Sequence, residues 1–174
     1  MKRIVLAALL LLIAVAYVAV LLAEEPKPAL NDPSLGTWVL NVQQSKFAGP
    51  APKAFIERYD MRPDGFFVST RSIINNDGSP AFQQAVFKLD GKEYELWDNG
   101  SLANFLATRK RDPQTLSGKA VDAYTAEYAV KQGGKVITTG KRTISKDGRT
   151  MTFSAKVTTP QGQSVDVVGV FDKQ

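Results

Sequence analysis

The stretch TMTFSAKVT at residues 150–158 decides the fold, because apolar and polar side chains alternate along its whole length. One set of alternate positions carries hydroxyl groups and a lysine, and the other carries four apolar residues: Met151, Phe153, Ala155 and Val157. Successive side chains of a β-strand point to opposite faces, so the pattern predicts a strand with one buried and one wet face. Strands of this kind are typical of antiparallel sheets.

The same pattern recurs from Gly36 onward, where runs rich in Val, Ile, Thr, Phe and Tyr are separated by turn residues. Asp-Gly and Asn-Gly pairs supply the positive φ angles that tight hairpins need. Such pairs or related turn motifs occur at residues 63–65, 76–78, 90–91, 99–100, 133–134, 147–148 and 161–162. The sequence therefore predicts strands near residues 36–42, 54–61, 66–74, 81–89, 92–97, 102–110, 114–121, 124–131, 135–145, 149–159 and 163–172.

A row of sequential hairpins predicts an all-β fold: an antiparallel up-and-down β-barrel of about 8–10 strands. Closure removes exposed sheet edges, and a barrel of this size can hold a small ligand inside. A two-sheet sandwich is the alternative, although it normally needs longer crossing connections than this chain shows.

A membrane-targeting segment precedes the barrel. Lys2 and Arg3 are followed by 20 apolar residues, 4–23, and then by a charged, proline-rich linker at residues 24–35. This order predicts that the domain at residues 36–174 works outside the cytoplasm, in the periplasm or secreted. The apolar run exceeds the usual signal-peptide core of about 7–15 residues. A cleaved signal peptide and a retained helical anchor that tethers the domain to the membrane are both open.

Composition limits the function classes. The roughly 150 residues after the targeting segment correspond to one domain that can bury its own core. The chain has no cysteine, so burial stabilises the fold without disulfides. Its net charge is +5, and loss of Lys2 and Arg3 would lower this to about +3. A charge this mild and scattered argues against nucleic-acid binding. We also expect the protein to be a monomer.

The domain opens with Gly36-Thr37-Trp38-Val39-Leu40-Asn41. This opening, together with residues 45–47, 49–53, 135–140, 145–152 and 170–174, resembles a family of small exported bacterial lipocalin-like proteins. It implies a lipocalin-like barrel in which Gly36 and Trp38 are structural and the indole closes one end. The family is largely uncharacterised, so the resemblance implies no reaction and no ligand.

The chain also departs from lipocalins proper. They place an arginine late in the barrel against the tryptophan, but residues 163–172 contain none. Arg142 and Arg149, one or two strands earlier, could only be analogues of it. The Arg-x-Tyr pair with which fatty-acid-binding barrels hold a carboxylate is absent as well.

The absence of histidine and cysteine excludes several kinds of chemistry. Ser-His-Asp and Cys-His nucleophiles, imidazole or thiolate metal sites and histidine-bound haem all need these residues. We expect no metal or cofactor and assign no catalytic residue, while an enzyme that uses Tyr, Lys or carboxylate groups inside the barrel stays open. Glu93 and Glu95 share one strand face, where repulsion could raise one pKa, but a wet strand face beside a turn explains the pair more simply.

Candidate ligand contacts are polar or aromatic residues on otherwise apolar strand faces. Tyr124 and Tyr128 alternate with Ala126, and Arg142 shares its face with Ile144. A buried arginine is costly unless it is paired or meets an anionic ligand, and a buried phenol needs a hydrogen-bond partner. We therefore expect an exported domain that binds a small, largely apolar ligand inside the barrel. The alternative is an envelope-tethered structural or protein-interaction domain with a solid core and no ligand.

Overall fold

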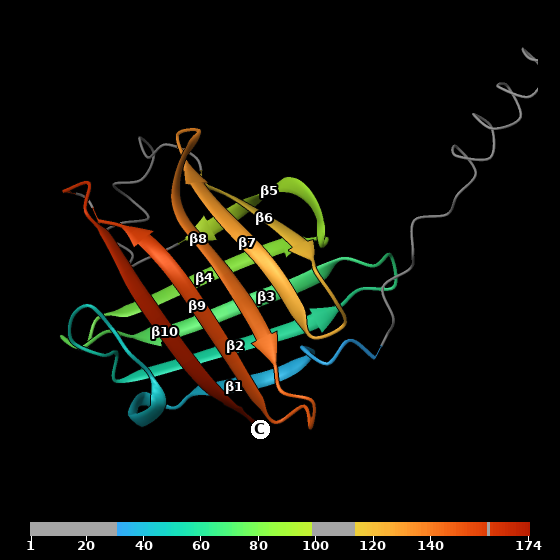
Figure 1. Ribbon diagram of the computed structural model, residues 1–174, viewed down its shortest axis with the longest axis horizontal. Helices are drawn as coiled ribbons and strands as arrows, with labels where there is room; N and C mark the ends of the chain where they lie inside the picture. The colour runs from blue at the N-terminus through green and yellow to red at the C-terminus, as the bar shows by residue number, and fades with distance from the viewer. Residues whose placement is uncertain (1–30, 99–113, 160) are drawn as a thin grey trace, which may run out of the picture.

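The computed structural model describes residues 31–98, 114–159 and 161–174, and their strands form one closed antiparallel barrel (Figure 1). The ten strands are β1 (Gly36–Leu40), β2 (Ala54–Met61), β3 (Phe67–Ile74), β4 (Pro80–Phe87), β5 (Asp90–Asp98), β6 (Gln114–Ala120), β7 (Thr125–Gln132), β8 (Lys135–Ile144), β9 (Thr150–Thr158) and β10 (Ser164–Lys173). A short 3₁₀ helix, η1 (Val42–Gln44), follows β1.

Each strand pairs with its neighbours in sequence, and β1 pairs with β10 to close the ring. The prediction of an up-and-down barrel is thus confirmed, and the sandwich alternative is not what the chain adopts. Of the eleven predicted strands, ten are present with small shifts of their ends. The eleventh, at residues 102–110, lies outside the described residues, as does the targeting segment.

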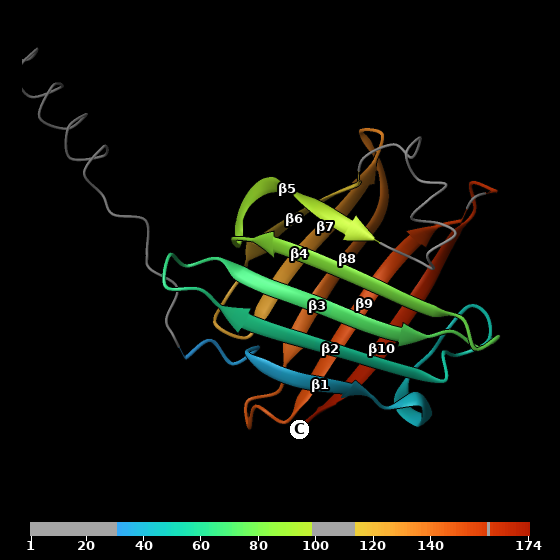
Figure 2. The same ribbon diagram turned by 180° about the vertical axis from the view of Figure 1, so that it is seen from behind.

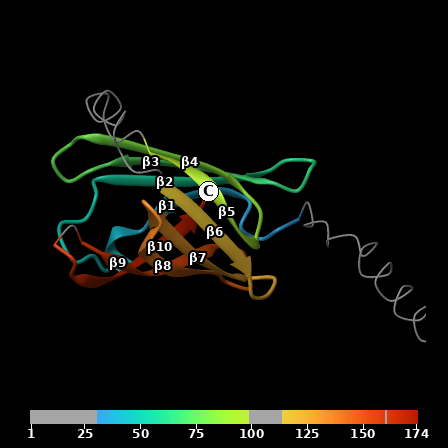
Figure 3. The same ribbon diagram turned by 90° about the horizontal axis from the view of Figure 1, so that it is seen from above.

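The barrel is flattened into two layers that cross at a steep angle. Strands β7–β10 run in front of β1–β4 in Figure 1, and the opposite view in Figure 2 shows β1–β4 nearest the reader. Seen from above in Figure 3, the two layers enclose the interior. Because side chains alternate along each strand, every second residue of all ten strands points into this space.

One half of the interior is packed solid. Large apolar side chains from both layers meet there and exclude water almost completely: Trp38, Tyr59, Phe67, Phe87, Tyr128, Ile144 and Met151. Aromatic contacts link the layers, with the Phe87 and Tyr128 ring centres 6.1 Å apart in an edge-to-face arrangement. This cluster is the hydrophobic core of the protein.

Trp38 is fully buried, and contacts hold both its indole N–H group and the face of its ring. Its indole Nε1 donates a hydrogen bond of 2.8 Å to the carbonyl oxygen of Ser34. The Lys173 Nζ atom, on the last strand, lies 5.0 Å from the centre of the indole ring. Lys173 of β10 is thus the cation that lies against the indole.

The described end of the predicted linker is tied to the barrel. Ser34 is completely buried, and its backbone and hydroxyl both donate to the Asp32 carboxylate. The Lys173 ammonium also donates to the carbonyl oxygen of Pro33 at 3.2 Å. Gly36, where the chain turns into β1, has a φ of +114°, and a Cβ there would lie 3.1 Å from Cε of Lys173. Glycine avoids both the strain and the contact.

We predict that Trp38→Ala lowers the free energy of unfolding by about 3–5 kcal/mol, the range for emptying a buried tryptophan site. The matched control is Trp97→Ala, because Trp97 is 59% exposed on the outer face of β5. Its loss should cost about 1 kcal/mol or less. Urea unfolding of both variants measures the difference. Equal stabilities would show that Trp38 does not hold the barrel together.

Candidate ligand-binding site in the barrel interior

The other half of the barrel interior contains a cavity of about 210 Å³. Most of its wall is apolar and comes from β1, β2, β9, β10 and the loop after η1: Leu40, Phe47, Phe55, Phe153, Ala155, Val157, Val167 and Phe171. The rings of Phe55 and Phe171 meet edge to face with centres 5.1 Å apart. Gly169 leaves the space that the Phe171 ring occupies, since a Cβ there would lie 2.9 Å from that ring.

A buried carboxylate lies where the cavity meets the packed core. Glu57 on β2 is 2% exposed, and its Oε1 atom accepts two hydrogen bonds. The Tyr59 hydroxyl donates at 2.5 Å and the Arg71 Nε donates at 2.9 Å. Glu57 and Arg71 both line the cavity, so they are the charged groups that a bound molecule would meet.

Neighbouring side chains hold the Arg71 guanidinium in place. Its Cζ lies 5.7 Å from the centre of the Phe153 ring, and its Nη1 donates to the amide oxygen of Gln83 at 3.4 Å. A quarter of the Arg71 side chain is exposed, whereas that of Glu57 is almost completely enclosed. The ion pair therefore has one buried end and one end that reaches toward solvent.

Arg142 on β8 lies inside the packed core and is 3% exposed. Its Cζ is 4.7 Å from the centre of the Tyr59 ring, 5.4 Å from that of Tyr128 and 6.0 Å from that of Phe67. The guanidinium is thus surrounded by aromatic faces. Its Nε and Nη1 atoms and the Tyr128 hydroxyl oxygen are buried without a hydrogen-bond partner.

Burial strongly affects the ionisation of this group of residues. It raises the pKa of Tyr59 to about 12, and the nearby Glu57 charge acts in the same direction. Burial also raises the pKa of Tyr128 well above its usual range. Burial opposes the charge of Arg142, but Tyr128, Tyr59 and the Asp32 carboxylate outweigh this effect and raise its pKa. Both phenols are therefore neutral and the guanidinium charged at physiological pH.

The structure brings two of the three predicted ligand residues together. Tyr128 and Arg142 both point inward, as the alternation of their strands predicted, but neither lines the cavity. Tyr124 does not join them: it lies in the turn before β7 and is 40% exposed. Strand β7 starts at Thr125, so the inward-facing residues of this strand begin with Ala126 and do not include Tyr124.

The sequence analysis did not predict the polar group formed by Glu57, Tyr59 and Arg71. One pattern in the sequence does indicate it. Glu57 and Tyr59 alternate with Ile56 and Arg58, and share their strand face with Phe55. An acidic residue between two aromatic positions of one face indicates a buried carboxylate. The pairing of Glu57 with Arg71 follows from the β2–β3 register, in which the two residues are opposite one another.

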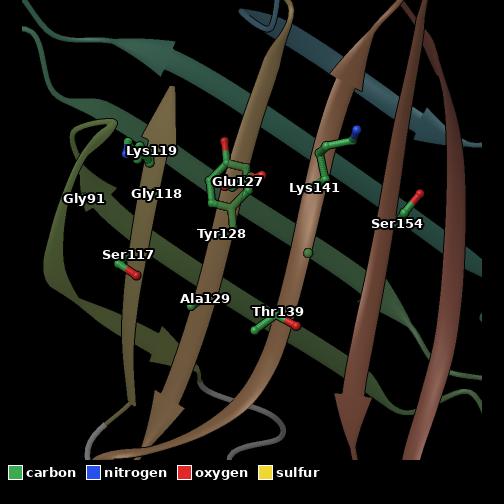
Figure 4. Close-up of a pocket in the computed structure, with 11 residues that line it drawn as sticks. Gly91, Ser117, Gly118, Lys119, Glu127, Tyr128, Ala129, Thr139, Lys141 and Ser154 are labelled. Carbon is green, nitrogen blue, oxygen red and sulfur yellow. The ribbon is translucent and has the colours of Figure 1, made fainter. Parts of the chain in front are cut away.

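A larger depression of about 570 Å³ lies over β6–β9 (Figure 4). Most of the side chains around it are hydroxyl or charged groups on the outer face of the sheet: Ser117, Lys119, Glu127, Thr139, Lys141 and Ser154. Charges of both signs are mixed there and are solvated. No feature of this surface selects a ligand, so we assign the site to the interior cavity.

Glu93 lies on the wet face of β5, as the simpler interpretation predicted. It accepts hydrogen bonds from the Thr115 hydroxyl and the Lys131 ammonium. The bond from Lys131 is the main reason that the pKa of Glu93 is lowered. A general acid would need a raised pKa, so the residue is an unsuitable proton donor.

Within the described ranges no helix is long and apolar enough to cross a membrane. Residues 4–23, where the sequence predicts a signal or an anchor, lie outside those ranges. The described residues also include no cluster of three or more acidic side chains that would hold a metal ion.

No family model matches this chain, and no curated protein matches it. Among solved structures it is similar to Rv2717c from M. tuberculosis, with 16% sequence identity and a TM-score of 0.53. The match covers 86% of this chain and 98% of that one. The likeness is one of fold. It supports a distant barrel relative, and the lipocalin-like family stays a hypothesis from the sequence.

We predict that Glu57→Gln destabilises the protein by about 3 kcal/mol, because it leaves the Arg71 guanidinium without its counter-charge. The lower end of the usual range applies, since Arg71 is partly exposed. Glu95→Gln is the control: Glu95 is exposed on β5, and its change should stay within about 0.5 kcal/mol. Chemical denaturation compares the two. A Glu57 variant as stable as the parent would contradict the assignment of a structural charge pair.

The raised pKa of Tyr59 also predicts a loss of stability in alkali. Between an ordinary tyrosine pKa of about 10 and the folded value of about 12, the unfolded chain has lost the proton and the folded chain has not. Stability is therefore complete below about pH 10 and falls as the pH rises toward about 12.

This loss should amount to at most about 1.4 kcal/mol per pH unit from Tyr59, and Tyr59→Phe should make the dependence shallower by that amount. Urea unfolding at a series of alkaline pH values measures it. An unchanged slope in the variant would mean that the folded state does not suppress ionisation of this phenol.

Proposed function

We propose that this chain is an exported, lipocalin-like binding protein that takes a small, largely apolar ligand into the interior cavity. The observation that carries the proposal is the division of the interior. One part is packed to exclude water, whereas another leaves a partly open cavity of about 210 Å³, lined mainly by apolar side chains and by one fixed charge pair. Apolar walls with a few well-placed polar groups are typical of ligand sites.

The cavity volume limits the size of the ligand. Sites for drug-sized molecules usually measure about 300–1,000 Å³, and an apolar cavity of about 150 Å³ is enough for benzene. A volume of about 210 Å³ therefore suits one aromatic ring or a short aliphatic chain. Long acyl chains would need the barrel to open.

The polar wall of the cavity favours a ligand with one hydrogen-bonding end. Glu57 and Arg71 are held by their mutual bond and by Tyr59 before any ligand enters. Because these groups are already ordered, hydrogen bonding of a ligand to them costs little side-chain entropy. The apolar body would then lie against Phe55, Phe171 and the strands opposite.

The N-terminal sequence supports the cellular part of the proposal. Lys2 and Arg3 before the apolar run at residues 4–23 are typical of a segment that directs the following domain across a membrane. A binding domain in the periplasm or medium needs no disulfide if its barrel is closed. A cleaved segment would release a diffusing carrier, and a retained one would hold the site at the membrane surface.

The alternative, a tethered interaction domain, was expected to have a solid core. The cavity argues against that expectation, while exposed apolar side chains on the outer face of β2–β5, namely Ile56, Phe82 and Trp97, favour a contact surface. The two functions predict opposite results in one binding experiment.

We predict that the purified protein binds single-ring alcohols such as benzyl alcohol, and that Ala155→Leu lowers the affinity at least about tenfold by filling the cavity. Ala155 is buried and lines the cavity. The control is Thr158→Leu, on the same strand but exposed on the other face, which should bind like the parent. Calorimetric titration measures the affinities. If the parent binds no ring or chain of this size, or if both variants behave alike, the interior is not the site and the interaction domain is favoured.

A further inference from the structure

The positive charge of Arg142 has no negatively charged partner in the packed core. Its side chain is almost completely buried, and neither Nε nor Nη1 has a hydrogen-bond partner. Aromatic faces on three sides provide a favourable environment for a cation, but they accept no ordinary N–H hydrogen bond. A buried charge in this state is costly unless something pairs with it.

The only fully buried acidic side chain of the described residues cannot serve as that partner. Glu57 is bound to Arg71, and its Oε1 already accepts from Tyr59. No ion pair joins Arg142 to any acidic side chain within the part of the chain that the structure describes. Glu57, Arg71 and Arg142 together thus carry a net charge of +1, and the partly buried Asp32 acts on Arg142 through space without forming an ion pair with it.

Tyr128 adds a second unsatisfied donor beside Arg142. The two residues lie on adjacent strands, where Arg142 pairs with Ala126 and Tyr128 follows two positions later. The Tyr128 hydroxyl is buried and makes no hydrogen bond, although a buried phenol ordinarily has a partner. Two guanidinium nitrogens of Arg142 and the hydroxyl of Tyr128 thus lack an acceptor. A neutral molecule could accept these bonds, but only an anion would also balance the charge.

We propose that Arg142 and Tyr128 bind one monovalent anionic group, a carboxylate, inside the barrel. A single negative charge brings the interior to neutrality, whereas a divalent anion would reverse its sign. Carboxylate oxygens accept from guanidinium and phenol donors in short, charge-assisted bonds that are about twice as strong as neutral ones.

Phe153 decides how such a group would reach the site. This side chain lines the cavity, and its ring centre lies 6.3 Å from that of Tyr128. It therefore separates the cavity from the packed core around Arg142. The carboxylate belongs either to a small free acid or to the polar end of a ligand whose ring lies in the cavity. Only the second case rests on the function proposed above.

The experiment titrates the purified protein with acetate, benzoate and benzyl alcohol by calorimetry. Acetate presents the charge alone, benzyl alcohol presents the ring alone, and benzoate presents both. The test variant is Arg142→Met, which replaces the charge with an apolar chain of similar length. Its control is Lys141→Met. Lys141 directly precedes Arg142 on β8 and is exposed on the outer face, and the substitution removes the same charge.

We expect benzoate to bind the parent and the Lys141 variant more tightly than benzyl alcohol does. Arg142→Met should weaken benzoate about tenfold to a hundredfold, the effect of hydrogen bonds to a charged group, and leave benzyl alcohol unchanged. Binding of acetate with the same dependence on Arg142 would identify a free acid, whereas binding of benzoate alone would identify a cavity ligand.

A second variant guards against misfolding of Arg142→Met. Tyr128→Phe removes only a hydroxyl that has no partner, so the fold is retained, and benzoate should bind about fivefold more weakly. The proposal is overturned if the parent does not prefer acids to the alcohol, or if Arg142→Met keeps the preference, which would make Arg71 the anchor. Acetate binding that depends on Arg142, without any binding of benzyl alcohol, would instead refute the cavity ligand and leave the anion site standing.

Discussion

The buried carboxylate of Glu57 is the constraint on which the interior depends. It accepts from Tyr59 on its own strand and from Arg71 on the next, and so fixes one polar layer across the barrel. Apolar packing continues on one side of this layer, and the cavity opens on the other. A charged group this deep is tolerated only when its donors are in place, so the layer also specifies how β2 and β3 are aligned.

Closure of the barrel depends on a different contact. Strand β1 is only five residues long and meets β10 along three residue pairs. The Trp38 indole reinforces this seam, since it is bonded to the Ser34 carbonyl and covered by Lys173. The Trp38 side chain thus contacts both the chain just before the barrel and the end of the last strand. Short edge strands are a weak point of sheets, and this contact removes the edge.

The candidate site combines opposite physical requirements. Under the proposed function, the apolar cavity wall attracts the ligand by releasing water, and the charges fixed at that wall set its orientation. Arg142 lies beyond that wall with two unsatisfied donors, so the part of the core that contributes most to packing also contains an uncompensated charge. Natural proteins retain such costly groups mainly where function requires them. On the proposal made above, this charge is what selects a ligand with an acidic end.

Local sequence determined the strands, because alternation and Gly-containing turns act over two to ten residues, as in residues 150–158. It also placed Tyr128 and Arg142 on inward faces and Trp38 in the core. Only the tertiary structure decided that Lys173 covers Trp38, that Arg71 is the partner of Glu57 and that Tyr124 points outward. These outcomes depend on strand register, on closure of the ring and on where each strand begins. Residues as far apart as Trp38 and Lys173 become neighbours only when the barrel closes, and no periodicity along the chain encodes that meeting.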